Sequence, residues 1–540
     1  MEDDHDYELQ KPVAGHNLDE DAALNELGYK SELTRSFGLL GMIGFSFSVV
    51  TSWTALSSVL IIGVESGGPP VMVWSWIGVC LFTLCVAYSM AEMCSAYPVA
   101  GGQYSWVAVM APRPIARGFS YIAGWFMLIG ILAMGATNNF IVANFILGLA
   151  NLCNPSYVIE RWHTALVAYC VGIAALGFNT LLPKLLDKVS KGIFIFNISS
   201  FVIVIVTILA VNDHKQPASF VFSDFVNLSG FNPSYTAVLG LLQSAFGMCC
   251  YDAPAHMTEE LKNARKEAPR AIVLAVYVGA FTGFIALIAL CFCMGDIEAT
   301  SSTATGVPVI EIIFNSTGSV AGATCLCALI TVIVSGASNS LTAEGGRAVY
   351  AFARDRGLPF SDFFGKVEPK RKIPVNALCL TVFVQLALDS IYFGTVTGFE
   401  TVISIATEGF YISYALVLLA RLTSLATRNP PPAARAIGGA YSLGRWSVPL
   451  NVLGLVYLVF IAITCNFPTV SPVTPENMNY TSAAVGIIMA IAAVTWVTTG
   501  RKQFRGPESG GVVIGEEVVG VQSVEVGGGV GGRGDGKGEK

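Results

Sequence analysis

Apolar stretches of about twenty residues recur along most of the chain, and this repetition constrains the fold more than any other feature. An α-helix rises 1.5 Å per residue, so about twenty residues cross roughly 30 Å of hydrocarbon. A water-soluble domain could not hide so many such helices. Only 13% of the residues are charged, against about 25% in an ordinary soluble domain. The chain is therefore predicted to be an all-α integral membrane protein.

About twelve of these stretches are predicted to be transmembrane helices. They lie near residues 38–62, 71–92, 118–148, 163–182, 192–211, 236–257, 271–294, 319–342, 374–393, 399–421, 447–467 and 482–499. They form a membrane domain at 34–500. The segments at 1–33 and 501–540 are predicted to be disordered cytoplasmic tails, because their polar or glycine-rich composition cannot bury enough apolar surface to fold.

The loops between the predicted helices differ in charge. Loops on one side carry most Lys and Arg residues, including those at 262–270 and 354–372, whereas the opposite loops hold only Arg161 and Lys215. Positively charged loops are retained in the cytoplasm, so both termini are predicted to be cytoplasmic. Three glycosylation sequons fall in the opposite, outer loops; they begin at Asn227, Asn315 and Asn479.

Two of the predicted helices contain patterns that interrupt a helix. The first, at 38–62, starts with spaced glycines and continues with the Phe/Ser run at 45–48. The sixth, at 236–257, holds Asp252 and Pro254 within FGMCCYDAP. Helices broken at corresponding positions of two halves are typical of secondary transporters, which bind substrate at the breaks. Glycines at such spacings also let helices pack closely, and the first pattern fits both interpretations equally.

Asp252 is the more specific of these signals. A carboxylate inside a membrane must be paired, protonated or hydrated, so a solute or proton role is favoured over a structural one. The chain has no phosphate-binding G-x-x-x-x-G-K-[ST] loop, which argues against an ATP-driven pump. His256 lies near the end of the sixth predicted helix, and no second histidine accompanies it there. We therefore predict no enzyme activity, no cofactor, no metal site and no nucleic-acid partner.

Three longer segments resemble a known family. They are AEMCSAYPVAGGQYSW at 91–106, EELKNARKEAPRAI at 259–272 and AEGGRAVYAFARDRGLP at 343–359. Together they resemble the amino acid–polyamine–organocation (APC) superfamily, particularly its fungal amino acid/choline branch of 4-aminobutyrate (GABA) permease-like transporters. The resemblance implies the leucine-transporter fold. That fold has two inverted repeats of five helices and two further helices, with helices 1 and 6 broken, and it works by alternating access.

The resemblance also implies a substrate site at the two broken helices. Backbone N–H groups of helix 1 would bind a carboxylate, and an aromatic gate and an amine-binding group would come from helix 6. Bulky side chains stand in helix 1 where family members often have small ones, which favours GABA, choline or another amine over a classical α-amino acid. The implied substrate-binding residues are Gly44, Phe45, Ser46, Phe47, Phe246, Tyr251 and Asp252.

Weaker candidates for coupling or gating lie in helices 8 and 10. Ser335, Ser338 and Asn339 fall near the cation site of the resembled family, although such side chains commonly bond neighbouring helices. Glu408 is a second carboxylate within the membrane, which could carry a proton, gate the pathway or pair with a backbone group.

The function predicted from the sequence is secondary active transport. The expected activity is symport of protons with an amino acid or a small amine such as GABA or choline, through a multi-pass protein of the plasma membrane. A nutrient sensor that does not transport, and a passive facilitator, are the alternatives on the same fold.

Overall fold

The computed structural model describes residues 29, 32–394, 396–435, 437–475, 477–504 and 506, with the side chains of 396–399 excluded. The tails predicted at 1–33 and 501–540 lie almost wholly outside these residues. Their disorder stays a prediction.

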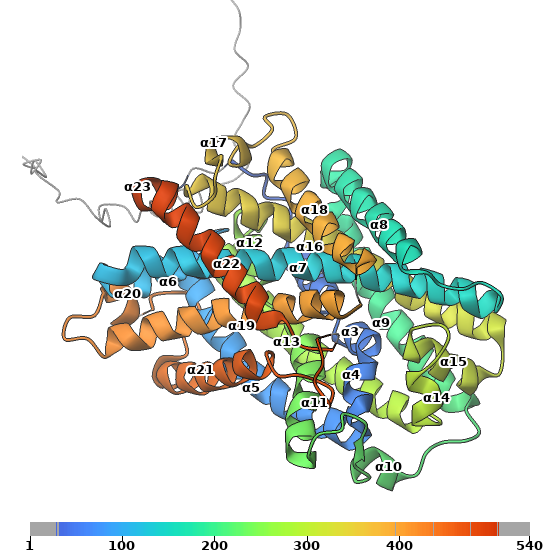
Figure 1. The fold of residues 1–540 in the computed structure, drawn as a ribbon. Coiled ribbons are helices and arrows are strands. Elements are labelled where there is room, and N and C mark those ends of the chain that lie inside the picture. Colours follow the sequence, from blue (N-terminus) through green and yellow to red (C-terminus); the bar gives the residue numbers. More distant parts are fainter. Residues whose placement is uncertain are drawn as a thin grey trace, which may run out of the picture.

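Helices dominate the structure and pack into one bundle (Figure 1). Within the described residues, eleven helical stretches are long and apolar enough to cross a membrane. The helices that make up these stretches are α2 (Leu39–Val50) with α3 (Ser52–Ser58), α5 (Gly68–Ala96), α7 (Arg113–Cys153), α8 (Arg161–Leu181), α9 (Leu186–Val211), α13 (Ala264–Phe292), α16 (Val320–Arg354), α18 (Val375–Asp389), α19 (Val396–Leu425), α21 (Ser447–Thr464) and α22 (Thr481–Thr495). An interrupted helix, α11 (Pro233–Gly247) followed by α12 (Ala253–His256), occupies the position of the predicted sixth span. The prediction of an all-α membrane protein with about twelve helices is confirmed.

Short elements lie between the long helices or extend their ends. The short helices are α4 (Leu60–Glu65), α6 (Gln103–Met110), α10 (Ala218–Phe222), α14 (Ile297–Ser301), α15 (Pro308–Thr317), α17 (Ser361–Phe364), α20 (Pro432–Arg435) and α23 (Arg501–Gln503). Single turns of 3₁₀ or π helix lie at Pro183–Leu185, Thr258–Glu260, Ser390–Phe393, Gly444–Trp446 and Trp496–Gly500. Strands β1 (Ser66–Gly67) and β2 (Val226–Asn227) pair antiparallel and tie the end of helix 1 to the loop before α11.

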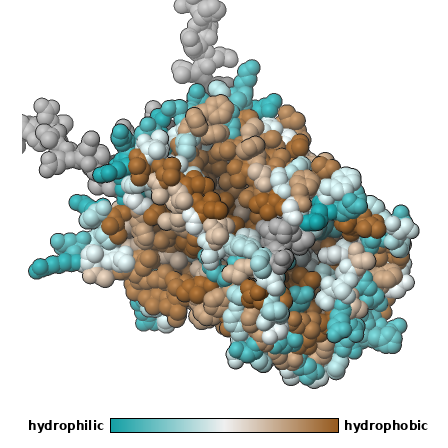
Figure 2. Space-filling model, in the orientation of Figure 1, coloured by the Kyte–Doolittle hydropathy of each residue, from teal (hydrophilic) through white to brown (hydrophobic). Residues whose placement is uncertain are grey.

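The flank of the bundle is apolar. Figure 2 shows broad brown areas on the side of the molecule, with teal residues gathered toward its ends. Large side chains such as Phe281 and Val497 are 66% and 73% exposed. Continuous apolar surface of this kind would be unfavourable in water, whereas it suits the hydrocarbon of a bilayer.

Glycines allow the closest helix contacts inside the bundle. A Cβ added to Gly130 of α7 would lie 2.8 Å from the backbone nitrogen of Phe410 in α19. A Cβ on Gly44 of α2 would lie 2.6 Å from the carbonyl oxygen of Ser190 in α9. Where no hydrophobic effect drives helices together, such close backbone approach supplies the van der Waals contact that holds them.

Candidate functional site

The first predicted transmembrane helix, which we call helix 1, comprises α2 and α3 and is interrupted at Thr51. This residue ends α2 and precedes α3 with φ 23° and ψ 50°, outside the α-helical region. The interruption lies four residues beyond Phe47, so the expectation that the helix opens around residues 44–47 is wrong about the position. The run at 45–48 is helical because its backbone groups continue the regular bonding of α2, which ends with the Thr51 N–H donating to the Phe47 carbonyl at 2.8 Å.

The four helix 1 residues expected to bind substrate all lie within α2. Gly44 faces the backbone of α9, as described above, so the close-packing interpretation applies to it. Phe45 and Phe47 make edge-to-face ring contacts with Phe37 and Phe194, at centroid distances of 5.8 and 5.5 Å. The buried hydroxyl of Ser46 has no hydrogen-bond partner among the described residues. A substrate role for these four residues stays a proposal.

The sixth predicted transmembrane helix, which we call helix 6, comprises α11 and α12 and is interrupted between Gly247 and Ala253. Cys250, within this break, has φ 63°, a left-handed conformation that a side chain rarely adopts. Pro254 lies in the first turn of α12, where its missing N–H group disrupts no helical bond. The sixth predicted span is therefore broken at the position that its proline and Asp252 indicated.

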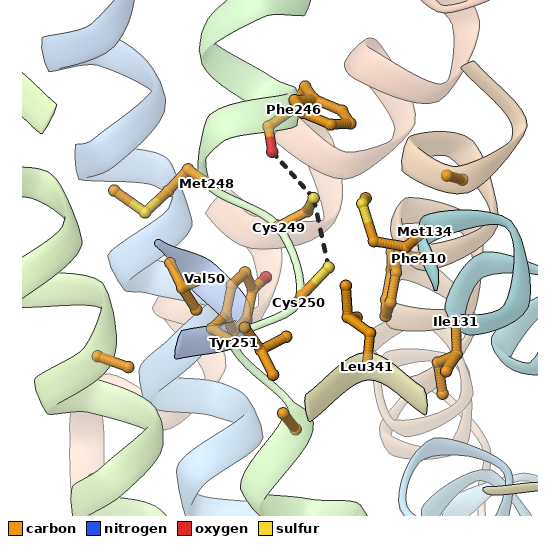
Figure 3. Packing of buried hydrophobic residues seen from close by; sticks show 14 of the residues in the cluster. Val50, Ile131, Met134, Phe246, Met248, Cys249, Cys250, Tyr251, Leu341 and Phe410 are labelled. Atoms are coloured by element: carbon orange, nitrogen blue, oxygen red, sulfur yellow. Dashed lines mark hydrogen bonds between the residues drawn. The ribbon is translucent and has the colours of Figure 1, made fainter. Parts of the chain in front are cut away.

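The two breaks meet at one small cavity of about 20 Å³. Figure 3 shows Cys249 and Cys250 on the side of the helix 6 break that faces Met134 and Phe410, and Tyr251 on the side of Val50. The cavity is lined by Val49, Val50, Thr51, Thr54, Ala55, Ser58, Met134, Asn138, Ile141, Phe246, Cys249, Cys250 and Val334. A volume of this size holds about one water molecule, so an amino acid or amine would need the helices to move apart.

Asp252 is fully buried and lies at the centre of a hydrogen-bonded cluster. The side chains of Gln103 in α6 and Tyr414 in α19 both donate to its carboxylate. The Nε2 atom of His256 in α12 lies 3.1 Å from Asp252 Oδ2. Three separate elements therefore contribute to one buried carboxylate.

His256 and Glu344 complete this cluster, and the sequence interpretation missed both. The donor atoms of Asp252, His256 and Glu344 lie within 4.8 Å of one another, and all three side chains are buried. Gln103, Tyr414 and His256 already surround the Asp252 carboxylate, so the cluster resembles a hydrogen-bonded proton site more than an open metal site. The spacing of four residues between Asp252 and His256, one helical turn, could have revealed that pair. Nothing in the sequence placed Glu344 of α16 beside it.

The remaining site predictions fall elsewhere in the bundle. The Ser335 hydroxyl donates to the Thr331 carbonyl at 2.7 Å, within its own helix. Ser338 donates to the side chain of Asn139, and the Asn339 amide oxygen accepts from Asn179 at 3.0 Å. One oxygen of Glu408 accepts from Asn466 at 2.9 Å. Apart from the Ser335 bond, these contacts join neighbouring segments of the bundle, and a coupling role for the four residues stays a proposal.

Trp53 of α3 is a further buried residue close to the helix 1 break. Its indole N–H donates to the Asn197 side chain of α9 at 2.7 Å, and its ring contacts Phe201 at a centroid distance of 5.7 Å. The contact ties the segment beyond the break to a neighbouring long helix.

Ion pairs close the end of the bundle at which the basic loops lie, which we call the basic end. Arg347 pairs with Glu260 at 2.7 Å, and Arg354 pairs with Glu259 at 2.9 Å. Both arginines belong to α16, and both glutamates follow α12 along the chain. Ion pairs thus join the turn after α12 to α16 at the basic end of the bundle.

Asp355, directly after α16, is held at the same end. Its Oδ2 atom accepts hydrogen bonds from the hydroxyls of Tyr29, at 2.9 Å, and Tyr104, at 2.8 Å. Burial raises the pKa of both tyrosines well above its usual value. Burial also raises the pKa of Asp355, because removal from water disfavours the charged carboxylate more than nearby Arg354 favours it.

Comparison with known proteins gives the family. The profile of the amino acid permeases matches residues 37–492. A Macrophomina phaseolina protein provisionally named an amino acid/polyamine transporter is 65% identical over 443 residues, covering 82% of this chain and 97% of the relative.

Two more distant relatives carry more specific names. The amino-acid permease BAT1 of Arabidopsis thaliana is 30% identical over 506 residues, covering 90% of this chain and 96% of the relative. A choline transporter of Saccharomyces cerevisiae is 30% identical over 478 residues, covering 88% and 83%. The chain belongs to the amino acid permease family of the amino acid–polyamine–organocation superfamily.

Proposed function

We propose that this permease is a proton symporter of an amino acid or a small amine such as GABA or choline. It works by alternating access in the plasma membrane, with both termini in the cytoplasm. The observation that carries the proposal is the buried Asp252 in the break of helix 6, whose carboxylate accepts hydrogen bonds from Gln103 and Tyr414 and lies 3.1 Å from His256.

A buried carboxylate at this position supports coupling to a cation. Asp252 has no exposed surface, and its partners come from α6, α12 and α19. A charge at such a site is stable only while these donors stay in place. Helix movements that admit substrate would disturb these donors, so the conformation of the helices and the protonation of the cluster around Asp252 depend on each other.

The walls of the cavity support a small solute with an amine. They combine hydroxyl groups of Thr51, Thr54 and Ser58 with the ring of Phe246. An ammonium or quaternary ammonium group binds well over an aromatic face, and hydroxyl and carbonyl oxygens accept from an amine. The names of the Arabidopsis permease and the yeast choline transporter agree with this range of substrates. Ser335, Ser338, Asn339 and Glu408 are proposed as secondary gating or coupling positions.

Reconstituted transport tests the proposal. Purified protein in proteoliposomes would be given labelled GABA, choline and a panel of amino acids, with and without an inward proton gradient. We expect saturable accumulation of one substrate, stimulated by the gradient and abolished by Asp252→Asn. Asp362→Asn is the matched control, because the Asp362 side chain is 81% exposed and pairs with Arg356 at the surface.

The other outcomes identify the alternative functions. Binding of a substrate without any accumulation would indicate a nutrient sensor. Equilibration of substrate that ignores the proton gradient would indicate a passive facilitator.

A further inference from the structure

We propose that Glu344 is the group that takes up and releases the transported proton, and that Asp252 and His256 form a fixed ion pair beside it. The inference rests on the proposed proton symport and names the residue that performs it. Glu344 lies in α16, which contacts α12 and pairs through two arginines with the turn that follows α12.

The hydrogen bonds of His256 define where its protons are. Its Nδ1 atom lies 3.0 Å from the carbonyl oxygen of Ala100, and a carbonyl only accepts, so Nδ1 carries a hydrogen. Its Nε2 atom lies 3.1 Å from Asp252 Oδ2. That contact needs a proton between the two atoms, on either the imidazole or the carboxyl group.

The other partners of Asp252 decide between the two positions. The amide nitrogen of Gln103 and the hydroxyl of Tyr414 also donate to the Asp252 carboxylate. These two donors favour the anionic form of Asp252, because hydrogen bonds to the charged form stabilise that form. In the proposed arrangement the shared proton is therefore on His256, and the pair is electrically neutral as a whole.

Glu344 has no such support. Its side chain is fully buried, and neither carboxylate oxygen has a hydrogen-bond partner within the described part of the chain. The nearest arginine along its own helix, Arg347, is paired with Glu260 at 2.7 Å. A buried carboxylate without donors is strongly unfavourable, so in this conformation Glu344 is the neutral acid.

Other titratable or charged groups lie around Glu344. Asp252, Cys249 and Cys250 interact with it electrostatically, and His256 lies in the same cluster. Tyr251 and Tyr414 face Asp252, and Arg347, one turn along α16, pairs with Glu260. Of the three carboxylates in this set, Asp252 and Glu260 have charged or hydrogen-bonding partners. Glu344 alone of these three has no hydrogen-bond partner among the described residues.

The location of Glu344 gives its proton a route. The carboxyl group lies one helical turn from Arg347, whose ion pair with Glu260 closes the basic end. When that pair separates, water reaches the carboxyl group, which releases its proton to the water and becomes a carboxylate. Opening of the opposite side reverses the step, since Glu344 then takes a proton from that solution. One proton is carried per cycle, and no other bond is made or broken.

Exchange and accumulation separate this role from a structural one. Wild-type protein and Glu344→Gln would be compared in proteoliposomes with labelled GABA, choline and alanine. Exchange of labelled for unlabelled substrate at equal pH needs no net proton movement, and we expect the variant to retain it within about two-fold. We expect accumulation driven by a proton gradient, and the accompanying proton influx followed with a trapped pH dye, to fall at least ten-fold. Glu311→Gln, in the outer helix α15, makes the same chemical change away from the cluster and is expected to behave as wild type.

Each result decides a separate point. If wild-type protein shows no gradient-driven accumulation, the proposed symport is wrong. If wild-type protein accumulates substrate and Glu344→Gln does so equally, symport stands and the assignment to Glu344 is overturned. Should the Gln variant not fold, Glu344→Asp replaces it. This variant keeps a titratable group on a shorter side chain, so the pH dependence of its accumulation is expected to shift, and an unchanged profile would overturn the assignment.

Discussion

Gly102 determines how closely the loop after α5 approaches the buried cluster. Its backbone has φ 55° and ψ −125°, and a Cβ built there would lie 2.7 Å from Cε1 of His256. Gly102→Ala is expected to lower stability by about 2–4 kcal/mol, because it combines backbone strain of about 1–3 kcal/mol with displacement of the imidazole. The thermal midpoint in detergent measures the change.

A second glycine provides the control for this variant. Gly306 also has positive φ, 68°, but has no atom within 4 Å of an added Cβ. Gly306→Ala therefore reports backbone strain alone. Equal losses in the two variants would show that the contact with His256 is unimportant.

Asp355 predicts a pH dependence of stability. Its pKa is raised in the folded protein, so the folded state binds a proton more tightly than the unfolded state, whose Asp titrates near about 3.9. The stabilisation is complete below that value and is lost as the pH rises through the folded pKa. The thermal midpoint of wild type relative to Asp355→Asn should therefore fall as the pH increases from about 4.

The exposed Asp362 should show the opposite sign. Its pKa is lowered by the hydrogen bond and charge of Arg356, so any stabilisation from its carboxylate is lost as the pH falls.

A wild-type advantage over Asp355→Asn that grows with pH would contradict the assignment for Asp355.

Single residues also mark what the sequence could reveal about the site. Asp252 was identifiable because a carboxylate inside an apolar segment is costly. Its partners were not, since Gln103 and Tyr414 lie 149 and 162 residues away along the chain. Such contacts depend on helix packing, which hydropathy does not encode.

At the scale of an element, the glycines at the start of helix 1 differ in how closely they pack against neighbouring helices. Gly44 contacts the backbone of α9, whereas an added Cβ on Gly38 meets nothing within 4 Å. Gly44→Ala is expected to separate the helices and cost about 1–3 kcal/mol, the usual range for overpacking. Gly38→Ala should be nearly neutral in the same thermal unfolding measurement. A stable Gly44→Ala protein with impaired substrate binding would instead favour the substrate-site interpretation.

The two breaks differed in how well the sequence located them. Pro254 and Asp252 cannot continue an apolar helix without disturbance, and helix 6 indeed opens just before them. In helix 1 the family resemblance put the substrate-binding backbone at 44–47, whereas the spaced glycines alone fitted an opening and close packing equally. The segment that follows the break at Thr51, α3, contacts α13 and α11, and such tertiary contacts are not contained in a local sequence pattern.

At the scale of the whole molecule, the positions of the helices were the most predictable feature. All twelve predicted spans correspond to helices in the structure, because the thickness of a bilayer fixes the length of an apolar segment independently of its neighbours. The arrangement of these helices around the cavity was supplied by family resemblance and not by composition.

The predicted orientation can be tested by glycosylation. Asn315 is exposed on α15, and the Asn479 amide donates to the carbonyls of Cys465 and Phe467 at 2.8 and 3.0 Å. An attached glycan would leave the Asn479 amide nitrogen only one hydrogen, which is too few for these two bonds. Asn479 is therefore a poor site for glycan attachment in the folded protein. In a eukaryotic host, Asn315→Gln should reduce the apparent mass and Asn479→Gln should not. A glycan on a sequon engineered into the basic loop at 366–372 would contradict the orientation.

The hydrogen bond between Trp53 and Asn197 gives the protein an optical reporter of its own cycle. The indole is buried two residues beyond the interruption of helix 1, and its emission shifts to longer wavelength when water reaches it. Rotation of α3 away from α9 would break that bond. The difference in fluorescence between wild type and Trp53→Phe should therefore follow the opening of the bundle in real time, without an added label.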